Sequence, residues 1–175
     1  RMQYAVQQEL GIEDATMQGI DYSSEDFDEN RVQAERAIVR AQYEYTQQML
    51  RDNNVENLTV YRGIKFDSDN PIQQQLQEQG ADFSGNTDDV TIQQRPVSSY
   101  SADGHVASRF ASGGQGESRA VIGAQIPADK IYSFSSSGPG TDLESEVVVL
   151  GGQDTVSAYT FDNSSTLYSS DIYDK

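Results

Sequence analysis

The sequence predicts an α+β domain, with helices in its first third and short β-strands after them. The stretch from about residue 30 to residue 52 has apolar residues at helical spacing and ends at two asparagines. From Leu58 onward the apolar runs are short and are separated by Gly, Ser, Asn and Asp. Helices followed by a series of strands are typical of α+β domains. The 175 residues are enough for one domain with its own core.

Four helical segments are expected in chain order. The stretch 2–19 favours a short helix pair broken at Gly11, and shorter helices are expected near 71–78 and 103–111. The long helix from about Asn30 to Asp52 is expected to use one face for packing, formed by Ala34, Ile38, Ala41, Tyr45 and Met49.

The expected strands are short apolar or β-branched runs bounded by turn residues. They cover residues 58–64, 89–92, 97–100, 119–126 and 144–150. Near the C-terminus a further edge strand is favoured by Tyr159, Phe161, Leu167 and Tyr168.

The charge of the chain excludes several classes of partner. Lys and Arg total 12 against 28 Asp and Glu, for a formal net charge of -16. Such a balance argues against stable binding to nucleic acid phosphates or to an anionic membrane surface. It is typical of proteins adapted to high salt, which suggests a halophilic organism or its virus; the alternative is an ordinary acidic protein.

The residue inventory also limits the chemistry. The chain has no Cys and one His, so cysteine nucleophiles, disulfides and Cys or His metal clusters are excluded, and no metal is expected. His105 follows Ser99 too closely for a serine-protease triad.

No run is long and apolar enough for a membrane span or a leader, so we expect a soluble chain. Its cellular location stays open and could be cytoplasmic, secreted or virion-associated. Because residue 1 is Arg, we also expect a processed piece, a fusion partner or a larger parent chain.

Three short motifs bear residues with chemical potential. In Tyr61-Arg62-Gly63 an arginine on an apolar strand precedes a glycine, which suits a phosphate or carboxylate ligand as well as a structural salt bridge. Ser98-Ser99-Tyr100-Ser101 places hydroxyls at a strand end, where they can orient a carboxylate or cap the following helix.

The third motif is Glu144-Ser145-Glu146, which leads into the apolar run 147–150. In a strand both glutamates lie on one face, about 7 Å apart. Like charges at this spacing repel, so the pair is typical of a site, such as the acid and nucleophile of a glycosidase. The alternative is two solvated glutamates in an acidic chain.

Taken in order, these motifs resemble those of the Arg-Ser-Glu class of mono-ADP-ribosyltransferases, which includes clostridial binary toxins and animal arginine-specific ectoenzymes. The resemblance runs from about Leu58 to Leu150. It implies two packed, mainly antiparallel β-sheets around an NAD cleft. Residues 1–55 would be a helical lead-in and residues 56–175 the catalytic core, together one compact domain.

The resemblance also implies roles for individual residues. Arg62 would anchor NAD near its phosphates, and the Gly63 backbone would meet the nicotinamide amide. Ser99 would hold the catalytic Glu146, with Ser98 as the alternative register, and Glu144 would direct transfer to arginine. Ser101 is the second serine of the motif, whose middle threonine is Tyr100 here. The segment from Ser133 to Leu143 stands where the family has its target-recognition loop, and Phe134 in this segment is a candidate to stack on nicotinamide or to contact the target.

The function implied is transfer of ADP-ribose from NAD, as a substrate, to a protein that presents an arginine, with release of nicotinamide. Two alternatives stay open. One is an NAD glycohydrolase, in which water replaces the acceptor. The other is a binding or structural module on the same fold, against which the combination of Arg62, Ser99, Glu144 and Glu146 argues.

Overall fold

The computed structural model describes residues 2–17, 28–65, 71–79, 86–102, 119–135 and 146–161. In chain order the elements are α1 (Met2–Leu10), α2 (Glu29–Asp52), β1 (Asn57–Lys65), α3 (Pro71–Glu78), β2 (Asn86–Ser101), β3 (Arg119–Pro127), a 3-10 turn (Ala128–Lys130), β4 (Ile131–Phe134) and β5 (Glu146–Phe161). The α+β class predicted from the sequence is confirmed. The helix expected near 103–111 lies outside the described residues.

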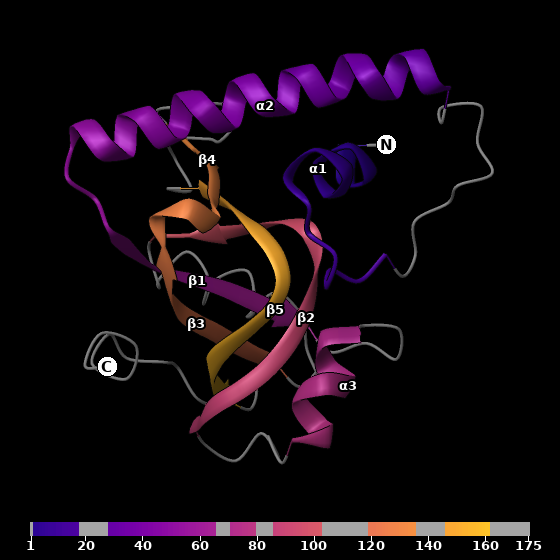
Figure 1. Cartoon of the computed structure of the whole chain (residues 1–175). Helices are drawn as coiled ribbons and strands as arrows, with labels where there is room; N and C mark the ends of the chain where they lie inside the picture. The colour runs from indigo at the N-terminus through magenta and orange to yellow at the C-terminus, as the bar shows by residue number, and fades with distance from the viewer. Residues whose placement is uncertain are drawn as a thin grey trace.

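The strands form one antiparallel five-stranded sheet in the order β2-β1-β3-β5-β4, and β2 also pairs with β5 (Figure 1). The described strands therefore form a single sheet and not the two packed sheets expected from the resemblance. The reason is the length of β5, whose 16 residues reach β2, β3 and β4. The main apolar core lies within this curved sheet and includes Val60, Ile92, Ile122 and Val149.

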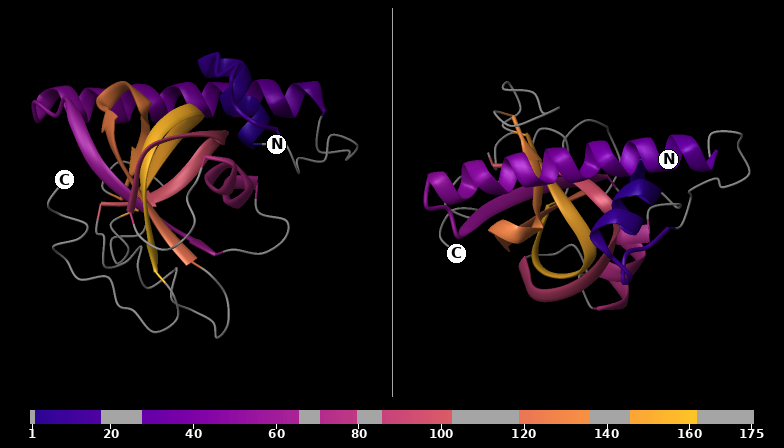
Figure 2. Two further views of the ribbon diagram at one scale, coloured as in Figure 1. Left: turned by 90° about the horizontal axis from the view of Figure 1, so that it is seen from below. Right: turned by 45° about the horizontal axis from the view of Figure 1, so that its top comes forward.

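α2 lies across one end of the sheet, as both views in Figure 2 show. Asp28 caps its start by accepting hydrogen bonds from the backbone N–H groups of Asn30 and Arg31, and Asn54, with a φ of 55°, follows its end. The Gln47 side chain donates to the Ala128 and Ile131 carbonyls, which joins α2 to the edge formed by β4. In the described part of the chain, no helix has the length and hydropathy needed to cross a bilayer.

The predicted packing face of α2 is wrong. Ile38 and Tyr45 are 62% and 56% exposed, and the residues buried instead are Val32, Val39, Thr46 and Leu50. The helix carries two stripes at similar spacing. The stripe that contains Val39 is the one buried, because it meets Ala5 and Val6 of α1 and Tyr132 of β4.

α1 is held against α2 by two ion pairs of one carboxylate. The carboxylate of Glu9, whose side chain is 5% exposed, accepts hydrogen bonds from Arg36 and Arg40 of α2. These two guanidinium groups lower the pKa of Glu9 below its ordinary value. Gly11, with a φ of 65°, ends α1 as predicted, but residues 12–17 do not form the second helix of the expected pair.

Glutamine side chains cover one edge of β2. Gln75 of α3 exchanges hydrogen bonds of 2.5–3.1 Å with the backbone N–H and C=O of Gln93. Gln79, which directly follows α3, does the same with Thr91 at 2.5–2.8 Å. Gln3 of α1 repeats the arrangement with Val97 at 2.8–2.9 Å. Each amide supplies one donor and one acceptor, as a paired strand would. The two helices are thereby attached to β2 at different points along the strand, α1 at Val97 and α3 at Gln93.

This arrangement predicts a stabilising role for Gln75 of α3 and for Gln79, which follows the helix. Replacing Gln75 and Gln79 together by alanine is expected to lower the free energy of unfolding by about 2 kcal/mol, because the edge of β2 loses four hydrogen bonds in partly solvated surroundings. Urea unfolding provides the measurement. The exposed residues Gln74 and Gln77, replaced in the same way, serve as the control, and an equal loss in both double variants would contradict the proposed bridging.

Candidate functional site

Glu146 is the first residue of β5 and lies between two neighbouring strands. Its register partner in β2 is Ser101, which in turn pairs with Tyr61 of β1. On the other side, the Ser135 N–H donates to the Glu146 carbonyl at 3.1 Å. The Glu146 backbone is thus fixed, while its side chain remains partly exposed. The three motifs singled out in the sequence therefore meet on three adjacent strands.

Ser99 contacts Glu146 directly. Its Oγ donates a hydrogen bond of 2.8 Å to Glu146 Oε1, which is the contact expected between these two residues. Alternation along β2 turns Ser99 and Ser101 to one face and Tyr100 to the other. Between the two registers considered, this contact favours Ser99 over Ser98.

Tyr100, which stands where the resemblance has threonine, belongs to the core. Its ring is 4% exposed, and its hydroxyl donates to Gln94 Oε1 at 2.6 Å. Arg62 Nη1 donates to the same oxygen at 3.4 Å, and the Arg62 guanidinium lies 6.0 Å from the centre of the Tyr100 ring. Tyr100 therefore lies on the opposite face of β2 from its two neighbouring serines and is a partner for Arg62.

Gln94 connects this group to a partly buried ion pair. Its amide Nε2 donates to Asp154 Oδ2 at 3.2 Å, and Lys130 Nζ donates to Asp154 Oδ1 at 2.5 Å. Arg62 and Tyr100 both donate, whereas the Asp154 carboxylate can only accept. A single orientation of the Gln94 amide, with Oε1 toward the two donors and Nε2 toward Asp154, therefore satisfies all three neighbours. Sequence analysis missed Gln94, Asp154 and Lys130. The Gln93-Gln94 pair was the available signal, yet only the strand pairing reveals its partners.

Burial raises the pKa of Tyr100 to about 12, so its phenol stays protonated and donates to Gln94 across the neutral range. An unfolded tyrosine ionises near 10, so the stability that comes from the protonated phenol is present below pH 10 and is lost as the pH rises toward 12. The native chain is expected to lose about 2–3 kcal/mol more stability over this interval than Tyr100→Phe does. Denaturant unfolding at each pH measures it. The exposed Tyr45, replaced by phenylalanine, should reproduce the native profile, and a Tyr100→Phe profile parallel to the native one would refute the prediction.

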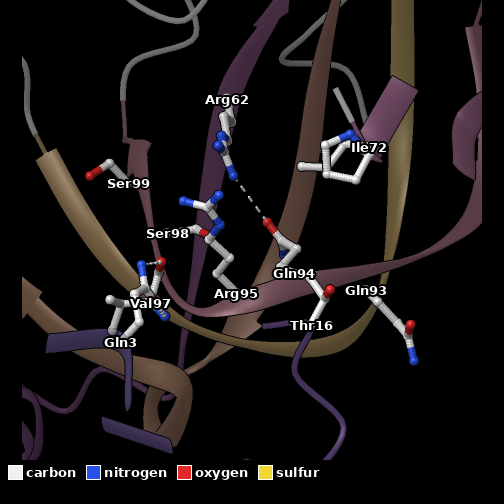
Figure 3. A pocket seen from close by; sticks show the side chains of 11 residues that line it. Gln3, Thr16, Arg62, Ile72, Gln93, Gln94, Arg95, Val97, Ser98 and Ser99 are labelled. Atoms are coloured by element: carbon white, nitrogen blue, oxygen red, sulfur yellow. Dashed lines mark hydrogen bonds between the residues drawn. The ribbon is translucent and has the colours of Figure 1, made fainter. Parts of the chain in front are cut away.

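A cavity of about 560 Å³ opens beside this network (Figure 3). Its walls come from the N-terminal segment, the start of α3, β1 and β2, and its lining includes Arg62, Gln94, Arg95, Ser98 and Ser99. The Thr16 N–H donates to the Gln94 carbonyl at 2.9 Å, which fixes the N-terminal wall. The volume suits a nucleotide-sized ligand.

The other predicted site residues lie away from the lining of the cavity. Glu146, Gly63, Ser101 and Phe134 are not among the described residues that line the cavity. Gly63 pairs with Val121 of β3, and Ser101 is buried. Phe134 pairs with Val147 and packs against the main core, one residue from the Ser135 contact to Glu146.

Two predicted features lie outside the described residues: Glu144, and residues 136–143 of the expected target-recognition loop. Within the described residues, no group of three or more His, Asp or Glu side chains could hold a metal ion. The residues that the structure brings together are thus Ser99 with Glu146, and Ser99 with Arg62 along one cavity. No protein-family model matches the chain, and no curated protein or solved structure is significantly similar to it.

Proposed function

We propose that this protein is a mono-ADP-ribosyltransferase that moves ADP-ribose from NAD to a protein arginine and releases nicotinamide. The observation that carries the proposal is the 2.8 Å hydrogen bond from Ser99 Oγ to Glu146 Oε1, made by a serine that also lines the cavity with Arg62. It joins the serine and the glutamate of the sequence motifs at the margin of a cavity that has a cationic side chain.

The chemistry requires these residue types. Breaking the bond between nicotinamide and ribose expels a neutral group and leaves positive charge on the ribose. An ionised Glu146 near the ribose 2′-hydroxyl would stabilise this charge more in the transition state than in the ground state. Ser99 would hold the carboxylate in position, and Arg62 would bind the phosphates so that the bond breaks within a fixed cofactor.

The acceptor step is assigned to Glu144. This carboxylate would bind the incoming guanidinium and accept its proton as the nitrogen attacks the ribose. Without this step water would complete the reaction, and the protein would act as an NAD glycohydrolase. The two activities therefore share the Glu146 chemistry and differ in the acceptor.

The experiment follows nicotinamide release and protein labelling together. The native chain is incubated with NAD that carries a tagged adenine and with an arginine-rich acceptor, at several salt concentrations including molar KCl. We expect both release and labelling, whereas Glu144→Gln should retain release and lose labelling. Release without labelling by the native chain would favour the glycohydrolase. Absence of NAD binding and of release at every salt concentration would refute both enzymatic activities and favour a binding or structural module.

A further inference from the structure

The cavity has a charge opposite to that of the chain. The whole sequence contains 28 acidic and 12 basic residues. Of the described residues that line the cavity, two are arginines, Arg62 and Arg95, and none is Asp or Glu. The other lining side chains are neutral, and several are hydroxyls or amides. A concave surface lined by one sign of charge concentrates counter-ions of the other sign, so the cavity favours an anionic ligand.

Arg62 retains donors for such a ligand. Within the described residues Arg62 donates to Gln94 Oε1 at 3.4 Å and also contacts the Tyr100 side chain, and no carboxylate forms an ion pair with it. A guanidinium has five N–H donors, so these contacts leave donors for a further partner. The side chain is partly buried, and a partly buried cation is stabilised when an anion joins it.

Arg95 is directed to the same cavity by an irregularity in β2. The pairing of β2 with β5 shifts between Gln94 and Val97, which places Arg95 in a β-bulge. The opposite strand accommodates the bulge through Gly151, because a Cβ on this glycine would lie 1.7 Å from the Arg95 carbonyl oxygen. Bulges redirect side chains, and they are frequent beside active sites. Figure 3 shows the Arg95 side chain extending toward the part of the cavity where Arg62 lies.

We propose that Arg62 and Arg95 together bind the diphosphate of a nucleotide ligand, with Arg95 as a second phosphate-binding residue beside the one expected from the sequence. Two guanidinium groups carried by β1 and β2 match two adjacent phosphoryl groups, each of which can accept paired N–H donors. This inference rests on the proposed function for the identity of the ligand as NAD. The charge of the cavity supports the diphosphate independently of catalysis.

The test measures binding of ADP-ribose, which carries the diphosphate and requires no cleavage. We expect Arg95→Gln to raise the dissociation constant of ADP-ribose, measured by calorimetry, at least about tenfold, as the loss of a charge-assisted contact predicts. Arg62→Gln should have a similar effect, and Arg95→Lys should recover part of the affinity. The affinity for adenosine, which has no phosphate, should be the same in all variants.

The control is Arg51→Gln in the last turn of α2, where the arginine bonds Gln48 of the same helix. It removes one positive charge away from the cavity and should leave ADP-ribose binding unchanged. The proposal is overturned if Arg95→Gln binds ADP-ribose as tightly as the native chain does, or if the Arg51 and Arg95 variants lose affinity equally.

The outcomes also separate this inference from the proposed function. ADP-ribose binding that depends on both arginines, in a native chain that does not release nicotinamide from NAD, would uphold the diphosphate site and refute the transferase. Nicotinamide release by a native chain whose ADP-ribose affinity is unaffected by Arg95→Gln would uphold the enzymatic activity and refute the role of Arg95.

Discussion

Replacing Glu146 by glutamine is expected to lower the rate of nicotinamide release from NAD by about 100-fold or more. An amide has nearly the shape of the carboxylate and can still accept the hydrogen bond from Ser99, but it lacks the charge that stabilises the developing cation. Thermal unfolding should change little, because the side chain is partly exposed at the end of a strand. Glu78→Gln, on the exposed side of α3, is the matched control and should keep the native rate.

The role of Ser99 can be resolved in the same assay. If Ser99 acts by positioning Glu146, Ser99→Ala should lower the rate in the native background and have little effect in the Glu146→Gln background. Equal effects in the two backgrounds would assign Ser99 a role independent of the carboxylate. A Glu146→Gln variant within about threefold of the native rate would refute the assignment of Glu146 itself.

Gly151→Ala is expected to destabilise the fold by about 3 kcal/mol or more. The new Cβ would lie 1.7 Å from the Arg95 carbonyl oxygen and 2.8 Å from its carbon, and both are backbone atoms that cannot rotate away. The paired strands β2 and β5 would have to separate at the bulge, with a cost at or above the usual range for overpacking. Urea unfolding, or complete failure to fold, would register the effect.

A second glycine of the chain offers a matched control for this substitution. Gly11 has a φ of 65° and open space around the position of a Cβ, so Gly11→Ala should cost only the strain of its left-handed backbone, about 1–2 kcal/mol. If Gly151→Ala costs no more than Gly11→Ala, the close approach of β5 to the bulge does not constrain the fold.

The elements predicted from the sequence are those with strong local signals. α3 covers the expected residues, and α2, β1 and β3 begin and end within one residue of the expected positions, because caps, periodicity and alternation define them. β2 was expected as two strands, over residues 89–92 and 97–100, and Pro96 lies between them. The bulge accommodates this proline, so the strand continues. The strand expected over residues 144–150 stops before Gly151-Gly152, yet β5 runs through this pair to Phe161.

The candidate site, like the fold, was predictable only in part. Ser99 and Glu146 were paired through a motif, and the sheet register brings them together. The group around Gln94 was not predictable. Its partner Asp154 is 60 residues away along the chain, Lys130 is 24 residues from Asp154, and the bulge sets the register of Gln94. Long-range pairing of polar side chains leaves no periodic signal in a sequence.

The glutamine side chains that bond to β2 hold this strand through contacts that depend little on salt concentration. Gln3, Gln75 and Gln79 are uncharged, so their hydrogen bonds to the strand change neither with the titration of carboxylates nor with the screening that salt imposes on ion pairs. In a chain with a net charge of -16, electrolyte can therefore strengthen or weaken the attraction of the two arginines for an anion. The hydrogen bonds along this edge of β2 do not share that dependence, so we expect ligand affinity to vary more with ionic strength than these contacts do.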